Sequence, residues 1–243
     1  MAASRLSRLR CDDMMVEASA LGTGFTVIMP MKPWDRAKSR LHVEPHARRA
    51  LAGAFARDTL EAVLHCPDVQ EVVVVTRGDL VVKYVRCAGA HVIQEPTDRP
   101  LDTLGSAIRH GIAWAAERRP HAPVAVIPSD LPALTSRALS ALLREVAGHP
   151  LAFVADAGGD GTTILTSRTP GQMHAGYGPD SAERHRSYRA FEITDADPVL
   201  RRDVDVFADL IQAHRLGLGP NTLRTFVHLT AEDAQAQRFV ATF

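Results

Sequence analysis

The chain has 243 residues, of which 46% are hydrophobic and 23% charged, so it can bury a substantial core as one large domain or two small ones. Lys plus Arg and Asp plus Glu both number 28, and this neutral balance excludes the long-range attraction that draws basic proteins to nucleic acid or anionic membranes. No apolar run is long enough to span a membrane, and three cysteines without CxxC spacing are typical of a reduced, cytoplasmic protein without structural zinc.

The two ends of the chain differ from its middle. In residues 1–24, Cys11, Asp12, Asp13 and Glu17 interrupt the apolar residues, so we predict a disordered extension rather than a signal peptide. Residues 220–243 follow the last predicted sheet-forming region, and we interpret them as an appendage of the same domain.

The first apolar run, residues 25–31, is short and rich in branched side chains, which predicts a buried strand. It leads into a loop that carries Lys32, Arg36, Lys38 and Arg40. Open α/β folds bind ligands at the carboxyl ends of their strands, and cations gathered there favour a polyphosphate. The alternative is a solvated basic surface loop.

Strands and helices alternate along the rest of the chain, which predicts an α/β fold: one domain over 25–219, built on a doubly wound, mostly parallel sheet with helices on both faces. The VVVV run after residue 70 predicts a strand covered on both faces, and Thr135 is placed to cap a helix. Asp58 lies on the apolar face of a helix, and we interpret it as structural, bonded to neighbouring backbone. Strands are predicted at 69–76, 90–94, 124–128, 153–156 and 164–166, and helices at 45–65, 79–88, 102–118, 181–190 and from DVDVFADL to about Gly217.

Three aspartates are candidate metal ligands. Asp130 lies just past a buried strand, where its carboxylate would meet whatever the basic loop binds, and carboxylates are hard oxygen ligands suited to Mg²⁺. Asp203 and Asp205 are spaced by two, so they point the same way in an extended segment and could clamp metal together with Asp130. The alternatives are a turn in which Asp130 bonds its own backbone, and an N-cap at Asp205 for the helix that carries Asp209.

Two glycine-containing loops are candidate anion contacts. GGDGTT offers close-approaching backbone N–H groups and threonine hydroxyls, although a glycine-rich hairpin also explains it. GYGPDS ends in Ser181 at a predicted helix start, where free N–H groups favour phosphate or carboxylate; alternatively Asp180 and Glu183 form a capping box. His185, one turn later, faces the same way as Ser181 and is either structural or an aid to an anion site.

The segments IMPMKPWDRAKSRL, IPSDLPAL, GGDGTTIL, GYGPDSAERH and DVDVFADL all fall at predicted strand carboxyl ends, so we expect one shared site. In this order they resemble the guanylyltransferases of coenzyme F420 biosynthesis, over about residues 25–216. That family transfers GMP from GTP to 2-phospho-L-lactate or phosphoenolpyruvate and belongs to the nucleotidyltransferase superfamily, which also contains the molybdopterin guanylyltransferases. The resemblance implies a parallel-dominated mixed sheet like that of nucleotide-diphospho-sugar transferases.

The resemblance also implies roles for particular residues. GTP and the phospho-acid would be the partners, without nucleic acid or membrane, and a homodimer is left open. The family's Asn is Thr163 here, and its helix-opening Leu-Asn step reads Leu104-Gly105 or Leu101-Asp102, so contacts to the nucleoside are not carried over. The implied sets are Lys32, Lys38 and Arg40 for the GTP phosphates, with Asp130 as the fourth catalytic residue; Asp130, Asp203 and Asp205 for Mg²⁺; and Thr163, Gly178 and Ser181 for the acceptor.

The implied reaction is in-line attack of an acceptor phosphate oxygen on the α-phosphorus of GTP, with loss of pyrophosphate. One alternative is another nucleotidyltransferase of the molybdopterin or sugar-phosphate type, although residues 30–41 lack the GGxSxRMG loop usual there. A second is a non-catalytic nucleotide-binding module, against which the three retained carboxylates argue. The absence of GxGxxG disfavours a dinucleotide-dependent oxidoreductase.

Overall fold

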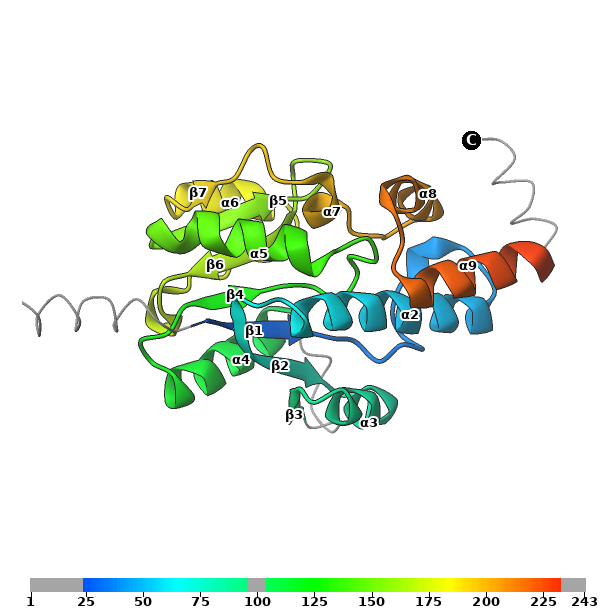
Figure 1. Cartoon of the computed structure of the whole chain (residues 1–243), viewed down its shortest axis with the longest axis horizontal. Helices are drawn as coiled ribbons and strands as arrows, with labels where there is room; N and C mark the ends of the chain where they lie inside the picture. The colour runs from blue at the N-terminus through cyan, green and yellow to red at the C-terminus, as the bar shows by residue number, and fades with distance from the viewer. Residues whose placement is uncertain (1–23, 96–103, 233–243) are drawn as a thin grey trace, which may run out of the picture.

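The computed structural model describes residues 24–95 and 104–232. In these ranges the chain forms one seven-stranded sheet in the order β3-β2-β1-β4-β6-β5-β7, with helices on both faces (Figure 1). Only the pairs β4–β6 and β5–β6 are antiparallel, so the predicted mostly parallel α/β sheet is confirmed. The predicted extension lies outside the described residues apart from Gly24, as does the end of the appendage after residue 232.

The elements follow the predicted order closely. Three were not predicted: β7 and α7, because both are too short to show a period, and the helix α9, which lies in the segment interpreted only as an appendage. The helix predicted to reach residue 190 ends at Ser187, two residues before Arg189 adopts a left-handed φ of 59°. No helix in the described ranges is long and apolar enough to cross a membrane. The strands are β1 (Phe25–Pro30), β2 (Val69–Thr76), β3 (His91–Gln94), β4 (Val124–Val126), β5 (Leu151–Ala155), β6 (Thr162–Ser167) and β7 (Phe191–Glu192); the α-helices are α2 (Pro45–Leu64), α3 (Asp79–Cys87), α4 (Leu104–Arg118), α5 (Ser136–Glu145), α6 (Ser181–Ser187), α7 (Pro198–Arg201), α8 (Phe207–Leu216) and α9 (Pro220–Glu232), with 3-10 turns at Ser39–Leu41, Val146–Gly148 and Pro170–Gln172.

Alternate residues of the central strands feed two separate cores. Val27 and Met29 of β1 face the core that α2, α3 and α5 cover, whereas Ile28 faces the core under α4 and α6. The valines of β2 divide in the same way, so the prediction that both faces of this strand are covered is confirmed. The helix cap predicted at Thr135 is confirmed as well, because its hydroxyl accepts a hydrogen bond from the Ala138 amide at 3.1 Å.

The reversed strand β6 decides which loops meet at the carboxyl edge of the sheet, the edge where β1 to β4 end. Because β6 runs against β4 and β5, its first residue, Thr162, lies at that edge. The glycine loop between β5 and β6 is therefore a hairpin connection, as the simpler interpretation held. Its turn is closed by Asp156, whose side chain accepts from the Gly159 amide at 2.6 Å, and Gly159 takes a φ of 88° that favours glycine.

Buried Asp58 on α2 holds the start of α9, which packs against α2 (Figure 1). One carboxylate oxygen accepts from the Asn221 amide at 3.0 Å, and the other accepts from the Thr222 amide at 2.7 Å. A β-carbon on Gly219 would lie only 2.4 Å from the Asp58 carboxyl carbon, so this approach requires glycine. Asp58 is structural, as predicted, but the backbone it binds lies more than 160 residues away.

We expect Asp58→Ala to lower the free energy of unfolding by about 3 kcal/mol, since it leaves buried amide donors at a helix start without an acceptor. Urea denaturation followed by circular dichroism measures this change. Asp195→Ala, at an exposed aspartate, is the matched control and should stay within about 0.5 kcal/mol of the wild type. Equal stability of the two variants would mean that α9 docks without help from Asp58.

Candidate active site

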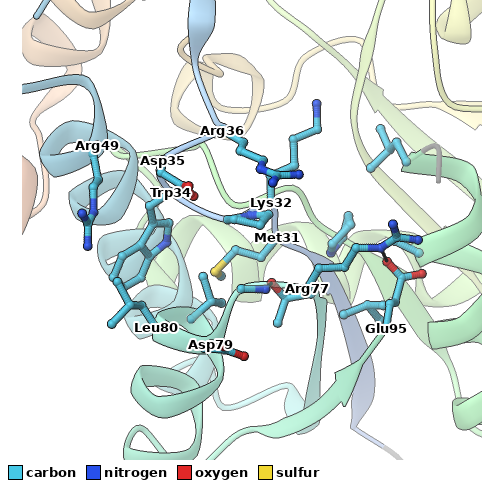
Figure 2. A pocket seen from close by; sticks show the side chains of 18 residues that line it. Met31, Lys32, Trp34, Asp35, Arg36, Arg49, Arg77, Asp79, Leu80 and Glu95 are labelled. Atoms are coloured by element: carbon cyan, nitrogen blue, oxygen red, sulfur yellow. Dashed lines mark hydrogen bonds and ion pairs between the residues drawn. The ribbon is translucent and has the colours of Figure 1, made fainter. Parts of the chain in front are cut away.

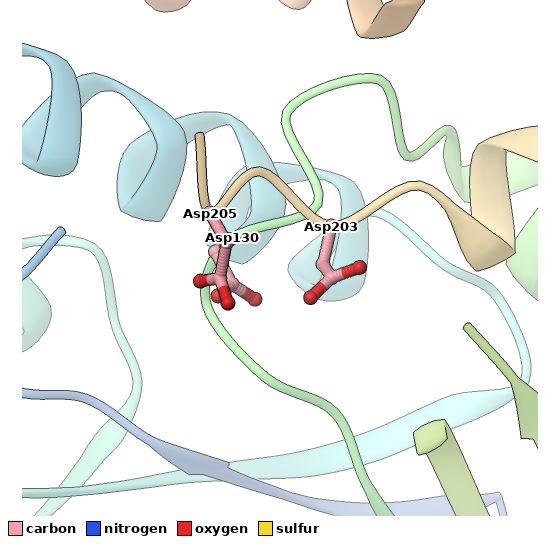
Figure 3. A group of neighbouring side chains, drawn as sticks. All are labelled: Asp130, Asp203 and Asp205. Carbon is pink, nitrogen blue, oxygen red and sulfur yellow. The ribbon is translucent and has the colours of Figure 1, made fainter. Parts of the chain in front are cut away.

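Asp130, Asp203 and Asp205 come together at the carboxyl edge and are called the acidic cluster below (Figure 3). Asp130 follows β4, and the other two precede α8. The Val204 amide donates to the Asp130 carbonyl at 3.1 Å, and the Val204 side chain is fully buried, so its two neighbours both point to the other side. One carboxylate oxygen from each aspartate lies within 4.8 Å of the others.

Two cations of the basic loop contact this cluster. The Lys38 ammonium donates to Asp130 and, at 3.0 Å, to Oδ1 of Asp205, while Arg40 Nη2 donates to Oδ2 of Asp205 at 2.7 Å. Lys38 has a left-handed φ of 56°, which turns the chain after the loop into the 3-10 turn that begins at Ser39. The loop predicted to meet the carboxylates therefore does so. Lys32 is exposed at its start.

Charge and burial shift the ionisation of the cluster. Burial, together with the carboxylates of Asp130 and Asp205, raises the pKa of Asp203 to about 7. Burial acts to raise the pKa of Asp205 too, but Lys38, Arg40 and Lys32 hold it below its ordinary value. Burial acts to lower the pKa of Lys38, and the attraction of Asp130 and Asp205 outweighs it and raises that pKa. Negative charge is therefore in excess around Asp203.

The acidic cluster is chemically suited to a divalent cation. Oδ1 of Asp130 is buried and has no hydrogen-bond partner among the described residues, so it is free to act as a ligand. Burial and the neighbouring carboxylates both disfavour the charged form of Asp203, and a bound cation would offset these effects. Hard oxygen donors from three carboxylates match the requirements of ions such as Mg²⁺.

The alternative roles considered for these aspartates do not hold. Asp205 is not an N-cap: the cap residue of α8 is Val206, and the Asp209 side chain accepts from the Val206 amide at 2.9 Å and from the Asp205 amide at 3.1 Å. Asp209 thus satisfies the helix start and leaves the Asp205 carboxylate to Lys38 and Arg40. The Asp130 carboxylate likewise pairs with Lys38.

Thr163 lies near the start of β6, Gly178 in the loop that leads to α6, and Ser181 at the first residue of α6, all in the half of the sheet beyond β4. The Thr163 hydroxyl is buried and donates to the Leu200 carbonyl at 2.7 Å, and the residue sits where the β5–β6 register shifts. Gly178 has a φ of 122°, and buried Ser181 begins α6. The predicted capping box is wrong: Asp180 is the cap residue but takes a left-handed φ of 54°, and its side chain makes no capping bond.

His185 lies on α6 and is fully buried. Its Nδ1 lies 2.8 Å from the Thr162 hydroxyl, and its Nε2 accepts from the Gly176 amide at 3.0 Å. Burial, with a smaller effect from the charge of Arg184, lowers the pKa of His185 to about 4.

Because of His185, we expect the free energy of unfolding to fall as the pH drops from about 7 to 4. An unfolded histidine gains its proton near pH 6.5, whereas folded His185 stays neutral until about pH 4, so the unfolded state binds more protons in between. The contribution reaches about 3 kcal/mol at pH 4. It is measured as the difference between the pH profiles of wild type and His185→Phe in urea titrations. His46→Phe, at an exposed position, should keep the wild-type slope.

A cavity of about 810 Å³ opens on the other side of the basic loop (Figure 2). Its walls come from the ends of β1 and β2, the start of α3 and Glu95 after β3. Trp34 forms one wall, stacked under Arg57 at 5.2 Å, and Glu95 is buried with its carboxylate 3.5 Å from Arg77. Sequence reasoning did not find these residues, although Arg77 and Glu95 directly follow predicted strands. Lys32 lines the cavity, and its charge also helps to lower the pKa of Asp205, so this side chain links the cavity electrostatically to the acidic cluster.

The fold is that of known nucleotidyltransferases. A solved nucleotide-diphospho-sugar transferase from Desulfovibrio desulfuricans G20 matches 90% of this chain and 99% of its own, with a TM-score of 0.65 and 18% identity. A nucleotidyl transferase from Methanothermobacter matches 80% of this chain and 98% of its own, with a TM-score of 0.54 and 14% identity. The family model of the MobA-like NTP transferase domain matches residues 43–210. Fold and site together thus define an enzyme of the nucleotidyltransferase class.

Relatives with similar sequences show to which family of nucleotidyltransferases the chain belongs. The phosphoenolpyruvate guanylyltransferase of Streptomyces scabiei is 42% identical over 203 residues, which are 82% of this chain and 94% of the relative. That of Salinispora arenicola is 40% identical over 204 residues, 82% and 91% of the two chains. The chain belongs to the phosphoenolpyruvate guanylyltransferase family within the MobA-like NTP transferases, and the resemblance drawn from its motifs is confirmed.

Proposed function

We propose that this chain transfers GMP from GTP to phosphoenolpyruvate and releases pyrophosphate, in the biosynthesis of coenzyme F420. The observation that carries the proposal is the acidic cluster, which lies against the basic loop; residues of the same loop line a cavity large enough for a nucleoside. 2-Phospho-L-lactate is the second candidate acceptor, since it differs from phosphoenolpyruvate only at one carbon–carbon bond.

In the proposed reaction a phosphate oxygen of the acceptor attacks the α-phosphorus of GTP. A new P–O bond forms, the bond from the α-phosphorus to the bridging oxygen breaks, and its electron pair leaves with pyrophosphate. The attacking oxygen is already anionic, so no general base is required. The protein's task is to align the two substrates and to offset negative charge.

Each part of the carboxyl edge has a role in this proposal. Asp130, Asp203 and Asp205 would hold Mg²⁺, which when bound neutralises charge on the phosphate oxygens. Lys32, Lys38 and Arg40 would bind the GTP phosphates and offset the charge that builds on the departing pyrophosphate. In the free enzyme Lys38 and Arg40 are paired with carboxylates, so binding of the nucleotide requires these two side chains to change partners.

The two substrates would occupy opposite sides of the acidic cluster. The cavity lined by Trp34 and Glu95 would take the nucleoside of GTP, because it borders the basic loop through Lys32. Thr163 at the start of β6, Gly178 in the following loop and Ser181 at the start of α6 would bind the carboxylate and phosphate of the acceptor. Since the Thr163 hydroxyl is committed to the Leu200 carbonyl, its contribution would come from the backbone.

The function is tested with purified protein, GTP, Mg²⁺ and each acceptor in turn. We expect pyrophosphate release that depends on phosphoenolpyruvate, with a product whose mass equals that of GMP joined to the acceptor. If a product formed with 2-phospho-L-lactate and not with phosphoenolpyruvate, the acceptor would be reassigned and the guanylyltransferase activity would stand. GTP binding without pyrophosphate release with either acceptor would favour the non-catalytic module.

Ser181→Ala is expected to raise the KM for phosphoenolpyruvate about tenfold, since it removes one hydrogen-bonding group from the acceptor site. The KM for GTP should stay unchanged, and steady-state kinetics with each substrate varied in turn measures both values. Ser187→Ala, at the exposed end of the same helix, is the matched control. An effect confined to GTP would show that the acceptor site is misplaced.

A further inference from the structure

The side chain of His185 connects two segments that carry proposed acceptor residues, the start of β6 and the loop that leads to α6. Thr162 is the neighbour of Thr163 on β6, and Gly176 lies two residues before Gly178 in the loop that leads to α6. We propose that His185 is a positioning residue, which sets the distance between these two segments and thereby the affinity for the acceptor. This inference rests on the proposed function, because it takes the acceptor site from it.

The hydrogen bonds of His185 define one protonation state. The Gly176 amide can only donate, so Nε2 must carry a lone pair, and the ring proton must sit on Nδ1. Nδ1–H then donates to the Thr162 hydroxyl at 2.8 Å. Both ring nitrogens are therefore used, one toward each segment, and only the neutral ring with its proton on Nδ1 makes both bonds.

The surroundings leave His185 no freedom to serve the ligand directly. The ring is fully buried, with the rings of Phe153 and Tyr177 at 5.6 Å and that of Tyr188 at 6.2 Å. It contacts neither the acidic cluster nor the basic loop through any bond among the described residues. Any influence of His185 on the reaction must therefore act through the positions of the two segments it bonds, at Thr162 and at Gly176.

Other bonds attach α6 to the glycine loop before β6 and to the loop that leads to α6. The Ala182 amide donates to the Asp160 carbonyl of the glycine loop at 3.0 Å. Arg184 Nε donates to the Gly176 carbonyl at 2.8 Å, and its Nη2 donates to the Pro179 carbonyl. Helix α6 is thus bonded both to the segment that ends at Thr162 and to the loop that precedes α6. In this set of bonds, His185 is the one side chain that contacts both segments.

The test uses Thr162→Val, which removes the hydroxyl that accepts from Nδ1 at nearly constant volume, and Thr162→Ser, which keeps it. Calorimetric titration with phosphoenolpyruvate gives the Kd, and steady-state kinetics gives the KM for each substrate. We expect Thr162→Val to weaken phosphoenolpyruvate binding about tenfold, because it leaves a buried donor unpaired and frees the loop. The KM for GTP should not change, and Thr162→Ser should restore the wild-type Kd.

His185→Phe provides a second variant that keeps the aromatic packing and removes both bonds. Its thermal unfolding is followed first, and we expect it to bind phosphoenolpyruvate more weakly than Thr162→Val while its KM for GTP stays at the wild-type value. Wild-type acceptor affinity in folded Thr162→Val and His185→Phe would overturn the inference and leave the proposed function intact. Failure of the wild type itself to bind phosphoenolpyruvate would instead overturn the proposed function, and this inference with it.

Discussion

Replacing Asp130 by Asn is expected to lower kcat about 10³-fold, because it removes one carboxylate charge of the proposed metal site and with it roughly 4 kcal/mol of transition-state stabilisation. The side chain keeps its size, so the packing around β4 should persist. The Kd for GTP should change by no more than about threefold, since the carboxylate acts mainly in the transition state. Pyrophosphate release at saturating substrate and Mg²⁺ measures kcat, and nucleotide titration measures the Kd.

Asp195→Asn makes the same chemical change at an exposed position outside the acidic cluster and should keep wild-type turnover. Binding of Mn²⁺, followed by electron paramagnetic resonance, gives a second readout that does not depend on activity, and Asp130→Asn should weaken it. Near-normal turnover in Asp130→Asn would remove this residue from the catalytic machinery and end the metal assignment.

Replacing Lys38 by Met is expected to have two opposite effects. The kcat should fall roughly 10²-fold, because one cation that stabilises the leaving pyrophosphate is lost. Mn²⁺ should bind the nucleotide-free enzyme about tenfold more tightly, since the ammonium no longer shares the carboxylates with the metal. This second effect follows from the position of Lys38 between Asp130 and Asp205, where its charge would compete with a bound metal ion for both carboxylates.

Lys83→Met, on the exposed side of α3, is the control for Lys38→Met and should change neither quantity. Kinetics and Mn²⁺ titration are performed on the same preparations. Weaker Mn²⁺ binding in Lys38→Met would mean that the lysine organises the carboxylates rather than competing with the metal for them.

Sequence patterns predicted the strands and their succession along the chain well where the signal is local, but not the order of the strands within the sheet. The strand predicted at 69–76 matches β2 residue for residue, because four consecutive valines between polar ends leave little freedom in its limits. The reversal of β6 could be anticipated only as a hairpin at the glycine loop. β7 escaped prediction because two residues carry no period, and its place beside β5 is set by tertiary packing.

The sequence indicated candidate residues of the site, but not the contacts between them. Asp130 directly follows a strand, as the sequence predicts, whereas Asp203 and Asp205 follow helix α7 and not a strand, so that part of the prediction is wrong. The Lys38 contact depends on a left-handed backbone turn that lysine rarely adopts. The capping box at Asp180 failed for the same reason. The cavity beside Trp34 stayed hidden because its walls come from three strand ends that are distant in sequence.

The residues proposed to bind the two substrates come from separate stretches of the sequence. Everything proposed for acceptor recognition lies in one continuous stretch from β5 to α6, whereas the proposed nucleoside cavity is built from residues before α4, apart from two at the start of that helix. Exchange of that one stretch between relatives is therefore expected to transfer the preference for a phospho-acid while the choice of base stays with the recipient. Evolution can thus vary one substrate without rebuilding the pocket for the other.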